Sequence, residues 1–204
     1  MLHLETIEPD TLGLLKRLMA RPYLAGFNLV GGTALSLQLG HRVSVDLDLF
    51  TAQAFESAVL LEQLQKDFSS VEPTHAMGST LLCRIEVIKV DFVRFRYPFQ
   101  YPLIEQENLR LVSSADIASM KLDAIAAKGR RKDFYDLYFL LEDFTLPQIL
   151  ETYSAMFQHS TLFHVIRSLT YFEDAEADAT PLIFDKTVTW DKVKKRVAAE
   201  VRKL

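Results

Sequence analysis

The chain has 204 residues, 49% of them hydrophobic, with seven glycines and seven prolines, which predicts one folded domain or one domain with a compact helical extension. The formal charge of −4 argues against a protein that coats nucleic acid through a broadly basic surface, and the single cysteine, Cys83, excludes an internal disulfide and a thiolate metal cage. No uncharged apolar run is long enough to cross a bilayer, so we expect a cytoplasmic protein that has no membrane partner.

The first half of the chain alternates helical and strand patterns. Leucines at helical spacing predict a helix over residues 9–20, and residues 27–30 form a short apolar run typical of a buried strand. The two glycines that follow predict a turn into a helix that begins near Thr33. Further along, the patterns predict a strand over 44–50, a helix over 54–68, and strands over 71–75, 80–85 and 88–95, the last two joined as a hairpin near Glu86-Val87.

From Ser113 onward the pattern is helical. Ser113 is a typical N-cap for a helix that runs to Lys128, where Gly129 ends it. Further helices are predicted over residues 131–143, 147–157, 162–172 and 189–204. Because the α/β half precedes the helical half, we predict an α+β fold, with a core over residues 1–112 and a helical C-terminal subdomain over residues 113–204.

Two carboxylates alternate with apolar residues in the strand predicted over residues 44–50. The period of two places Asp46 and Asp48 on one face of this strand and the apolar residues on the other. Carboxylates so close repel each other unless a divalent cation lies between them, and Mg²⁺ is usually held by such oxygens together with substrate phosphates. We therefore predict that Asp46 and Asp48 bind a metal ion.

Asp91 interrupts the apolar pattern of the strand predicted over residues 88–95, which we expect to neighbour the strand of Asp46 and Asp48. A third carboxylate there would complete the kind of metal site that two-metal phosphoryl transfer uses. The alternative is a solvent-facing position on an alternating strand, which is the simpler explanation for Asp91 taken alone.

The turn Gly31-Gly32-Thr33 precedes the carboxylate strand. Backbone N–H groups at such a helix start can receive a phosphate, because glycine lets a ligand approach and the helix dipole favours an anion. Arg42 either contacts a phosphate or neutralises the acidic strand. We therefore group Gly31, Gly32, Thr33 and Arg42 as candidate nucleotide-binding residues, although the glycine pattern is neither a dinucleotide fingerprint nor a Walker A loop.

Lys121 and Asp136 are charged residues inside two predicted apolar helices. This placement indicates that the helices meet, either as a partly buried ion pair or around a shared ligand. A lysine there can contact a triphosphate, and an aspartate can position that lysine or take a proton, but a structural salt bridge explains the pair equally well. A basic cluster lies between these two residues and is either a path for RNA or a solvated surface: Lys128, Arg130, Arg131 and Lys132.

Four ordered motifs, over residues 29–35, 41–50, 120–125 and 131–137, resemble those of the AbiEii/AbiGii-type nucleotidyltransferase toxins. The resemblance runs from about Phe27 to Leu141. It implies a polymerase-β-like nucleotidyltransferase core, which is a small mixed sheet with helices. The helical C-terminal subdomain would complete the active site of this core. The resemblance also implies Mg²⁺, a nucleoside triphosphate donor, and a toxin of a bacterial toxin–antitoxin or phage-defence pair with a cognate antitoxin.

The resemblance further implies roles for the matched residues. Gly31 and Gly32 would hold the donor phosphates, while Asp46 and Asp48 would bind Mg²⁺. Lys121 matches the lysine expected at the triphosphate. Asp136 matches the aspartate thought to act as base or orienting group. Asp91 lies outside the four motifs, so its place in the metal site depends on geometry alone.

The leading hypothesis is Mg²⁺-dependent transfer of a nucleoside monophosphate to an RNA hydroxyl, with release of pyrophosphate. Some relatives transfer nucleotides to the 3′ end of tRNA, so tRNA is one expected acceptor. The first alternative is a nucleotidyltransferase that modifies protein side chains. The second is a catalytically silent nucleotide-binding module, against which the Asp46–Asp48 pair and Lys121 argue.

Overall fold

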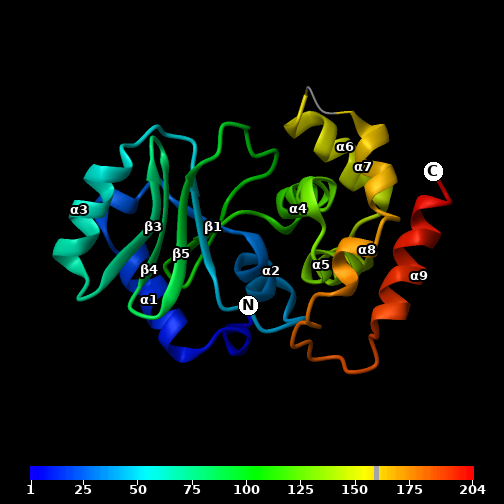
Figure 1. Ribbon diagram of the computed structural model, residues 1–204, viewed down its shortest axis with the longest axis horizontal. Helices are drawn as coiled ribbons and strands as arrows, with labels where there is room; N and C mark the ends of the chain where they lie inside the picture. The colour runs from blue at the N-terminus through cyan, green and yellow to red at the C-terminus, as the bar shows by residue number, and fades with distance from the viewer. Residues whose placement is uncertain (159–160) are drawn as a thin grey trace.

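Figure 1 shows the computed structural model, which describes residues 1–158 and 161–204. Its sheet is mixed and seven-stranded, in the order β3-β4-β5-β2-β1-β7-β6. The strands are β1 (Asn28–Val30), β2 (Leu47–Thr51), β3 (Val71–Met77), β4 (Thr80–Ile85), β5 (Ile88–Arg94), β6 (Ile104–Gln106) and β7 (Leu109–Leu111). The helices are η1 (Leu4–Thr6), α1 (Pro9–Met19), η2 (Pro22–Leu24), α2 (Gly31–Leu39), α3 (Ser57–Asp67), α4 (Ser114–Lys128), α5 (Arg131–Asp143), α6 (Leu146–Met156), α7 (Leu162–Ser168), α8 (Glu173–Glu176) and α9 (Trp190–Val201).

The middle of the sheet consists of β5, β2 and β1. Strand β2 runs parallel to β5 and antiparallel to β1, and this register places Asp48 beside Asp91 on one side and beside Val30 on the other. Leu47 and Leu49 are buried, whereas Asp48 is only half-buried on the opposite face of the pleat. The prediction that the strand of Asp91 neighbours the strand of Asp48 is confirmed.

Helix α2 connects the sheet with the helical half of the chain. It contacts β1 and β2 and also α4 and α5, while α5 packs against α9, which lies farthest from the sheet (Figure 1). Helix α3 covers β3 and β4, and α1 contacts β7. Buried residues from the sheet and from the helices form one hydrophobic core. The central strands β1 and β2 are therefore held in a fixed position relative to α4 and α5.

Most of the predicted elements are confirmed, including α1, α4, α5 and the β4–β5 hairpin, whose turn residue Glu86 has φ 59°. Sequence reasoning missed the β6–β7 hairpin, because each strand has only three residues. Its turn residues Glu107 and Asn108 both have positive φ, 54° and 60°. The helix predicted over residues 162–172 ends early, at Ser168 of α7, and the next helix, α8, begins beyond the predicted range. In the described residues, no helix is both long and apolar enough to span a bilayer.

The prediction that Asp46 lies on the carboxylate strand is wrong. Strand β2 begins at Leu47, because the preceding segment pairs with other parts of the chain instead of the sheet. The N–H of Ser44, for example, donates to the carbonyl of Thr6 at 3.0 Å. Val45, which the alternating pattern assigns to the apolar face, is 51% exposed. The position of Asp46 is therefore set by this loop.

Arg110 of β7 attaches the N-terminal segment to the sheet. Its guanidinium donates to the backbone carbonyls of Met19 (3.1 Å), Leu24 (3.0 Å) and Phe27 (3.2 Å). Replacing Arg110 with Met removes the donor from all three carbonyls, so we expect the free energy of unfolding, measured with urea, to fall by about 2–3 kcal/mol.

The matched control is Arg84→Met. Arg84 is exposed on β4, and its guanidinium donates a hydrogen bond to the carbonyl of Val87 at 3.2 Å. We expect this variant to stay within about 0.5 kcal/mol of the wild type. Equal losses in the two variants would contradict the role assigned to Arg110.

Candidate active site

A cavity of about 310 Å³ opens where β1 ends, α2 begins, and α4 and α5 face the sheet. Its lining combines glycine backbone, charged side chains and aromatic rings. The lining residues are Val30, Gly31, Gly32, Asp48, Phe50, Phe95, Ile117, Met120, Lys121, Asp123, Ala124, Lys132, Asp133 and Phe157. The cavity thus brings together predicted site residues from three separate motifs.

The Gly31-Gly32 turn forms one wall of the cavity. Gly31 has φ 68°, a left-handed conformation that favours glycine, and a Cβ atom there would collide with the carboxylate of Asp48. A Cβ atom on Gly32 would collide with the guanidinium of Arg42. A larger residue at either position would therefore displace a charged group of the site.

Asp48 is the carboxylate that lines the cavity. Burial, followed by the charge of Asp91, raises the pKa of Asp48 above its ordinary value. Among the described residues, Asp48 has no hydrogen-bond or ion-pair partner, and Oδ1 of Asp91 is likewise buried and unpartnered. Oδ2 of Asp91 lies 2.6 Å from Nζ of Lys89. Two adjacent carboxylates with unused oxygens form an arrangement whose charge a cation would neutralise.

Asp46 lies outside the strand and faces α5. Its carboxylate is 3.8 Å from Nζ of Lys132, and its backbone carbonyl accepts a hydrogen bond from the hydroxyl of Thr33. Within the part of the chain that the structure describes, no three His, Cys, Asp or Glu side chains form a group able to hold a metal ion. The carboxylates paired across the strand register are Asp48 and Asp91, and Asp46 does not complete a cluster of three with them.

Asp136 of α5 is fully buried and makes four polar contacts. Its Oδ1 lies 2.6 Å from Nε of Arg42 and 2.8 Å from Nε2 of His41. Its Oδ2 lies 3.0 Å from Nη2 of Arg42 and 2.7 Å from Nζ of Lys121. Burial alone would raise the pKa of Asp136, but Lys121, Arg42 and the hydrogen bond from His41 hold it well below its ordinary value. Asp136 is therefore ionised, and both of its oxygens are occupied by contacts to Arg42, His41 and Lys121.

Lys121 of α4 extends from this network into the cavity. Its Nζ lies 2.8 Å from Oδ1 of Asp133 and 2.7 Å from Oδ2 of Asp136. Burial would lower the pKa of Lys121, but the two carboxylates raise it above its ordinary value, so the amine is charged. An ammonium has three N–H donors, so two carboxylate contacts leave one donor for a ligand. The predicted meeting of the two helices at Lys121 and Asp136 is confirmed as a buried ion pair.

Arg42 and Thr33 have side chains that bind other parts of the protein. The guanidinium of Arg42, expected at a phosphate or the acidic strand, is 4% exposed and makes two hydrogen bonds to Asp136. Thr33 is 1% exposed, and its hydroxyl lies 2.8 Å from Oγ of Ser44. Neither is among the described residues that line the cavity. These side chains position the loop that carries Asp46.

Three features of the cavity were not assigned from the sequence. Lys132 and Asp133 both line the cavity, and the carboxylate of Asp133 forms an ion pair with Lys121. Both precede Asp136 by about one helical turn, so the spacing of charges in this motif was a usable signal. The aromatic wall had no such signal, because its residues come from three separate segments: Phe50, Phe95 and Phe157.

The basic cluster between α4 and α5 divides into separate roles. The guanidinium of Arg131 donates to two backbone carbonyls of α8, at 3.1 Å and 2.7 Å, and lies 5.0 Å from the ring centroid of Trp190. Arg131 therefore holds the C-terminal segments together. Lys132 lines the cavity, whereas Lys128 and Arg130 are exposed.

The fold is that of the nucleotidyltransferases. A putative nucleotidyltransferase from H. pylori aligns over 96% of this chain and 95% of its own, with 16% identity and a TM-score of 0.57. MenT4, the nucleotidyltransferase toxin Rv2826c from Mycobacterium tuberculosis H37Rv, aligns over 95% of this chain and 83% of its own, with 17% identity and a TM-score of 0.62.

The sequence itself gives the family. A profile described as "Nucleotidyl transferase AbiEii toxin, Type IV TA system" matches residues 13–203. The uncharacterized protein aq_aa25 of Aquifex aeolicus (strain VF5) is 35% identical over 158 residues, which cover 74% of this chain and 76% of that protein. The chain therefore belongs to the AbiEii family of nucleotidyltransferase toxins, and its enzyme class is nucleotidyltransferase. The resemblance drawn from the four sequence motifs is confirmed.

The network around Asp136 yields a stability prediction. In Asp136→Asn the buried cations Arg42 and Lys121 lose their shared counter-charge, so we expect unfolding free energy to fall by about 3–5 kcal/mol at neutral pH. Because the folded-state pKa of Asp136 is lowered, its contribution is complete above the ordinary carboxyl pKa and is lost as the pH falls towards the folded value. Urea unfolding of the wild type and the variant at several pH values measures the difference in their unfolding free energies.

Asp143→Asn is the control, because Asp143 is exposed at the end of the same helix. We expect this variant to differ from the wild type by less than about 0.5 kcal/mol. If the difference in unfolding free energy between the wild type and Asp136→Asn shrinks as the pH falls from roughly 8 to roughly 5, the lowered pKa of Asp136 is contradicted.

Proposed function

We propose that this protein transfers a nucleoside monophosphate from a nucleoside triphosphate to a hydroxyl of an RNA in the cytoplasm, with Mg²⁺ as cofactor and a cognate antitoxin as regulator. The single observation that carries the proposal is the cavity in which the uncompensated Asp48 carboxylate faces the Gly31 turn and shares a lining with Lys121 and Lys132. Carboxylate oxygens and phosphate-binding cations on one cavity are what nucleotidyl transfer requires.

The residues present fit a divalent cation. Asp48 has no partner among the described residues, and Oδ1 of Asp91 is buried and unpartnered there. Mg²⁺ is commonly bound through one or two carboxylates, with waters and substrate phosphates completing its coordination, so three clustered carboxylates are not needed. Asp48 would therefore hold the ion, with Asp91 and Asp46 as neighbouring carboxylates. When bound, Mg²⁺ supplies charge neutralisation at the phosphates and lowers the pKa of an acceptor hydroxyl.

The remaining groups of the cavity suit a triphosphate. Lys121 has one N–H donor beyond its two carboxylate contacts, and Lys132 is a second cation that lines the cavity. The backbone at Gly31 and Gly32 begins helix α2, so its N–H groups and the helix dipole favour an anion. We assign the donor phosphates to these groups.

In the proposed reaction, the acceptor oxygen forms a bond to the α-phosphorus, and the bond from that phosphorus to pyrophosphate breaks. Asp136 is an orienting residue in this scheme, because its oxygens already contact Arg42, His41 and Lys121. Because Asp48 is assigned to the cation, the proton of the acceptor hydroxyl is expected to leave to water or towards the unpartnered oxygen of Asp91.

The Asp48 assignment predicts a stability change that depends on the cation. Without added divalent cations, Asp48→Asn removes a half-buried charge beside Asp91, so we expect the variant to melt about 2–4 °C above the wild type, the shift that about 1 kcal/mol produces at this size. Millimolar Mg²⁺ should raise the melting temperature of the wild type but not of the variant.

Thermal melts of the wild type, Asp48→Asn and the control Asp143→Asn, with and without Mg²⁺, measure this. The control should respond to Mg²⁺ as the wild type does. An equal response in Asp48→Asn would remove Asp48 from the metal site.

The transfer itself is tested with each of the four labelled nucleoside triphosphates and total cellular RNA or protein. We expect label on RNA and expect Lys132→Gln to lower kcat/KM by roughly 10- to 100-fold, because a charged hydrogen bond to phosphate contributes about 1.5–3 kcal/mol. Lys128→Gln is the matched control, since Lys128 is an exposed lysine outside the cavity lining. Label on protein would favour the alternative acceptor class, and unchanged kinetics in Lys132→Gln would contradict the phosphate assignment.

A further inference from the structure

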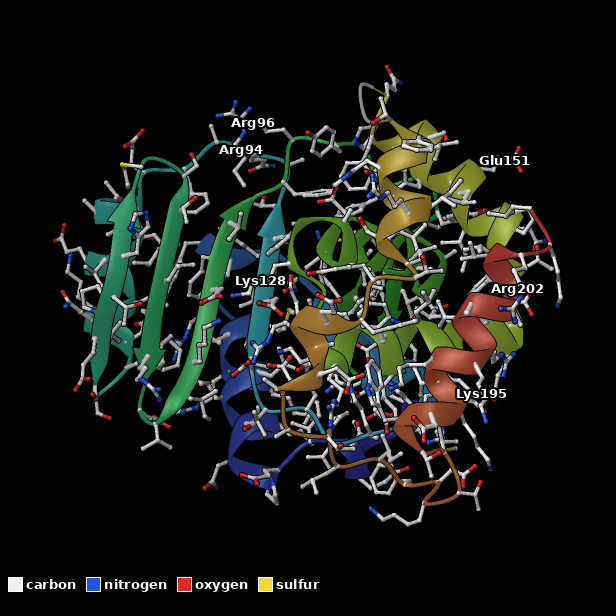
Figure 2. All side chains as sticks on the ribbon, turned by 45° about the vertical axis from the view of Figure 1, so that its right-hand side comes forward. Arg94, Arg96, Lys128, Glu151, Lys195 and Arg202 are labelled. Atoms are coloured by element: carbon white, nitrogen blue, oxygen red, sulfur yellow. The ribbon has the colours of Figure 1, made fainter. Side chains whose placement is uncertain are left out.

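The segment that follows β5 carries alternating aromatic and basic residues that no step of the proposed chemistry uses. We call it the acceptor strip and define it by Arg94, Phe95, Arg96, Tyr97 and Tyr101. Tyr97 and Tyr101 are each 46% exposed, which is high for large aromatic side chains. Figure 2 shows Arg94 and Arg96 together at the end of β5, on the side of the molecule away from Lys195 on α9 and Arg202 just after it.

The acceptor strip begins inside the cavity and continues to the surface. Phe95 lines the cavity, and its ring centroid lies 5.4 Å from that of Tyr97. Tyr97 in turn lies 4.8 Å from Phe157, which lines the cavity as well. Tyr101 borders a second cavity, of about 510 Å³, between this segment and α6. Aromatic faces therefore lead from the neighbourhood of Asp48 to open surface.

The two basic residues of the strip differ in how firmly they are held. Arg94 is held at its base by a hydrogen bond from Nε to the carbonyl of Ala52 at 3.3 Å. Arg96 is exposed and has no partner among the described residues. An exposed arginine that lies between two aromatic residues in the sequence suits a ligand whose planar rings alternate with negative charges.

The strip is held in place by a buried carboxylate. Asp116 of α4 is fully buried, and its oxygens accept hydrogen bonds from the backbone N–H groups of Gln100 (2.8 Å) and Tyr101 (3.1 Å). Phe99 stacks on Phe95 with a centroid distance of 5.4 Å and an interplanar angle of 17°. A preformed segment loses little conformational entropy when it binds a ligand.

We propose that the acceptor strip binds an unpaired stretch of the RNA acceptor and leads it to the cavity. Bases stack on Tyr97 and Tyr101, and Arg96 contacts a backbone phosphate. Paired bases cannot present their faces to these rings, so the strip selects single-stranded RNA over duplex. The RNA acceptor rests on the proposed function, but binding by the strip does not require transfer.

The test measures binding in the Asp48→Asn background, without triphosphate or divalent cation, so that no transfer occurs. The probe is a fluorescently labelled RNA of mixed sequence and about twelve nucleotides, within the usual range of single-strand sites, followed by anisotropy. We expect Tyr97→Ala to weaken binding by roughly 5- to 100-fold and Tyr97→Phe to preserve it, because stacking needs the ring and not the hydroxyl. Tyr171→Ala is the control, since Tyr171 is 51% exposed on the helical half.

The charge component is measured separately. Arg96→Ala should reduce the slope of log affinity against log salt by about 0.7, the value for one phosphate contact on a single strand. Arg202 is an exposed arginine just after α9, and Arg202→Ala should leave the slope unchanged. Tyr101→Ala serves as a second ring variant if Tyr97→Ala has a lowered melting temperature.

Three results would overturn the proposal. The first is RNA binding by both Tyr97→Ala and Tyr101→Ala that equals binding by the wild type. The second is equal affinity of the wild type for a blunt RNA hairpin and for the single strand. The third is that the tyrosine variants bind a triphosphate analogue more weakly but RNA equally well, which would assign the rings to the donor base. If the strip variants lose RNA binding as expected but the wild type labels no RNA, the proposed function fails while the binding strip stands.

Discussion

A single buried carboxylate, Asp136, holds together segments that are far apart in the chain. It joins α5 to Arg42 and His41 in the loop before β2, and to Lys121 on α4. Because an ionised group in the core must keep its counter-charges, these segments have little freedom to separate. This constraint fixes Lys121 at the cavity and fixes the guanidinium of Arg42 against Gly32.

The site contains two carboxylates in opposite electrostatic states. Asp136 has more positive partners than its own charge requires, and its pKa is lowered, whereas Asp48 has no partner among the described residues and its pKa is raised. Acids whose environments shift their pKa values in opposite directions are typical of a functional site. Within the proposed function, the compensated acid orients the lysine and the uncompensated acid holds the cation.

Much of this arrangement could be predicted from residue patterns. Helical spacing located α4 and α5, and the charges of Lys121 and Asp136 within them correctly indicated that the helices meet. The role of Arg42 could not be predicted, because its partner is 94 residues away and a guanidinium suits a carboxylate as well as a phosphate. The alternation around Asp46 was misleading, since tertiary pairing of the loop with Thr6 overrides a local period of two.

The most direct test of the account is the Mg²⁺ dependence of binding of a non-hydrolysable nucleoside triphosphate analogue, measured by titration calorimetry. The account predicts that Mg²⁺ strengthens binding to the wild type by at least roughly tenfold, a coupling free energy of about 1.4 kcal/mol, and that Asp48→Asn abolishes this coupling. Wild-type binding that is unaffected by Mg²⁺, or coupling that persists in Asp48→Asn, would contradict the claim that Asp48 joins the cation to the donor phosphates.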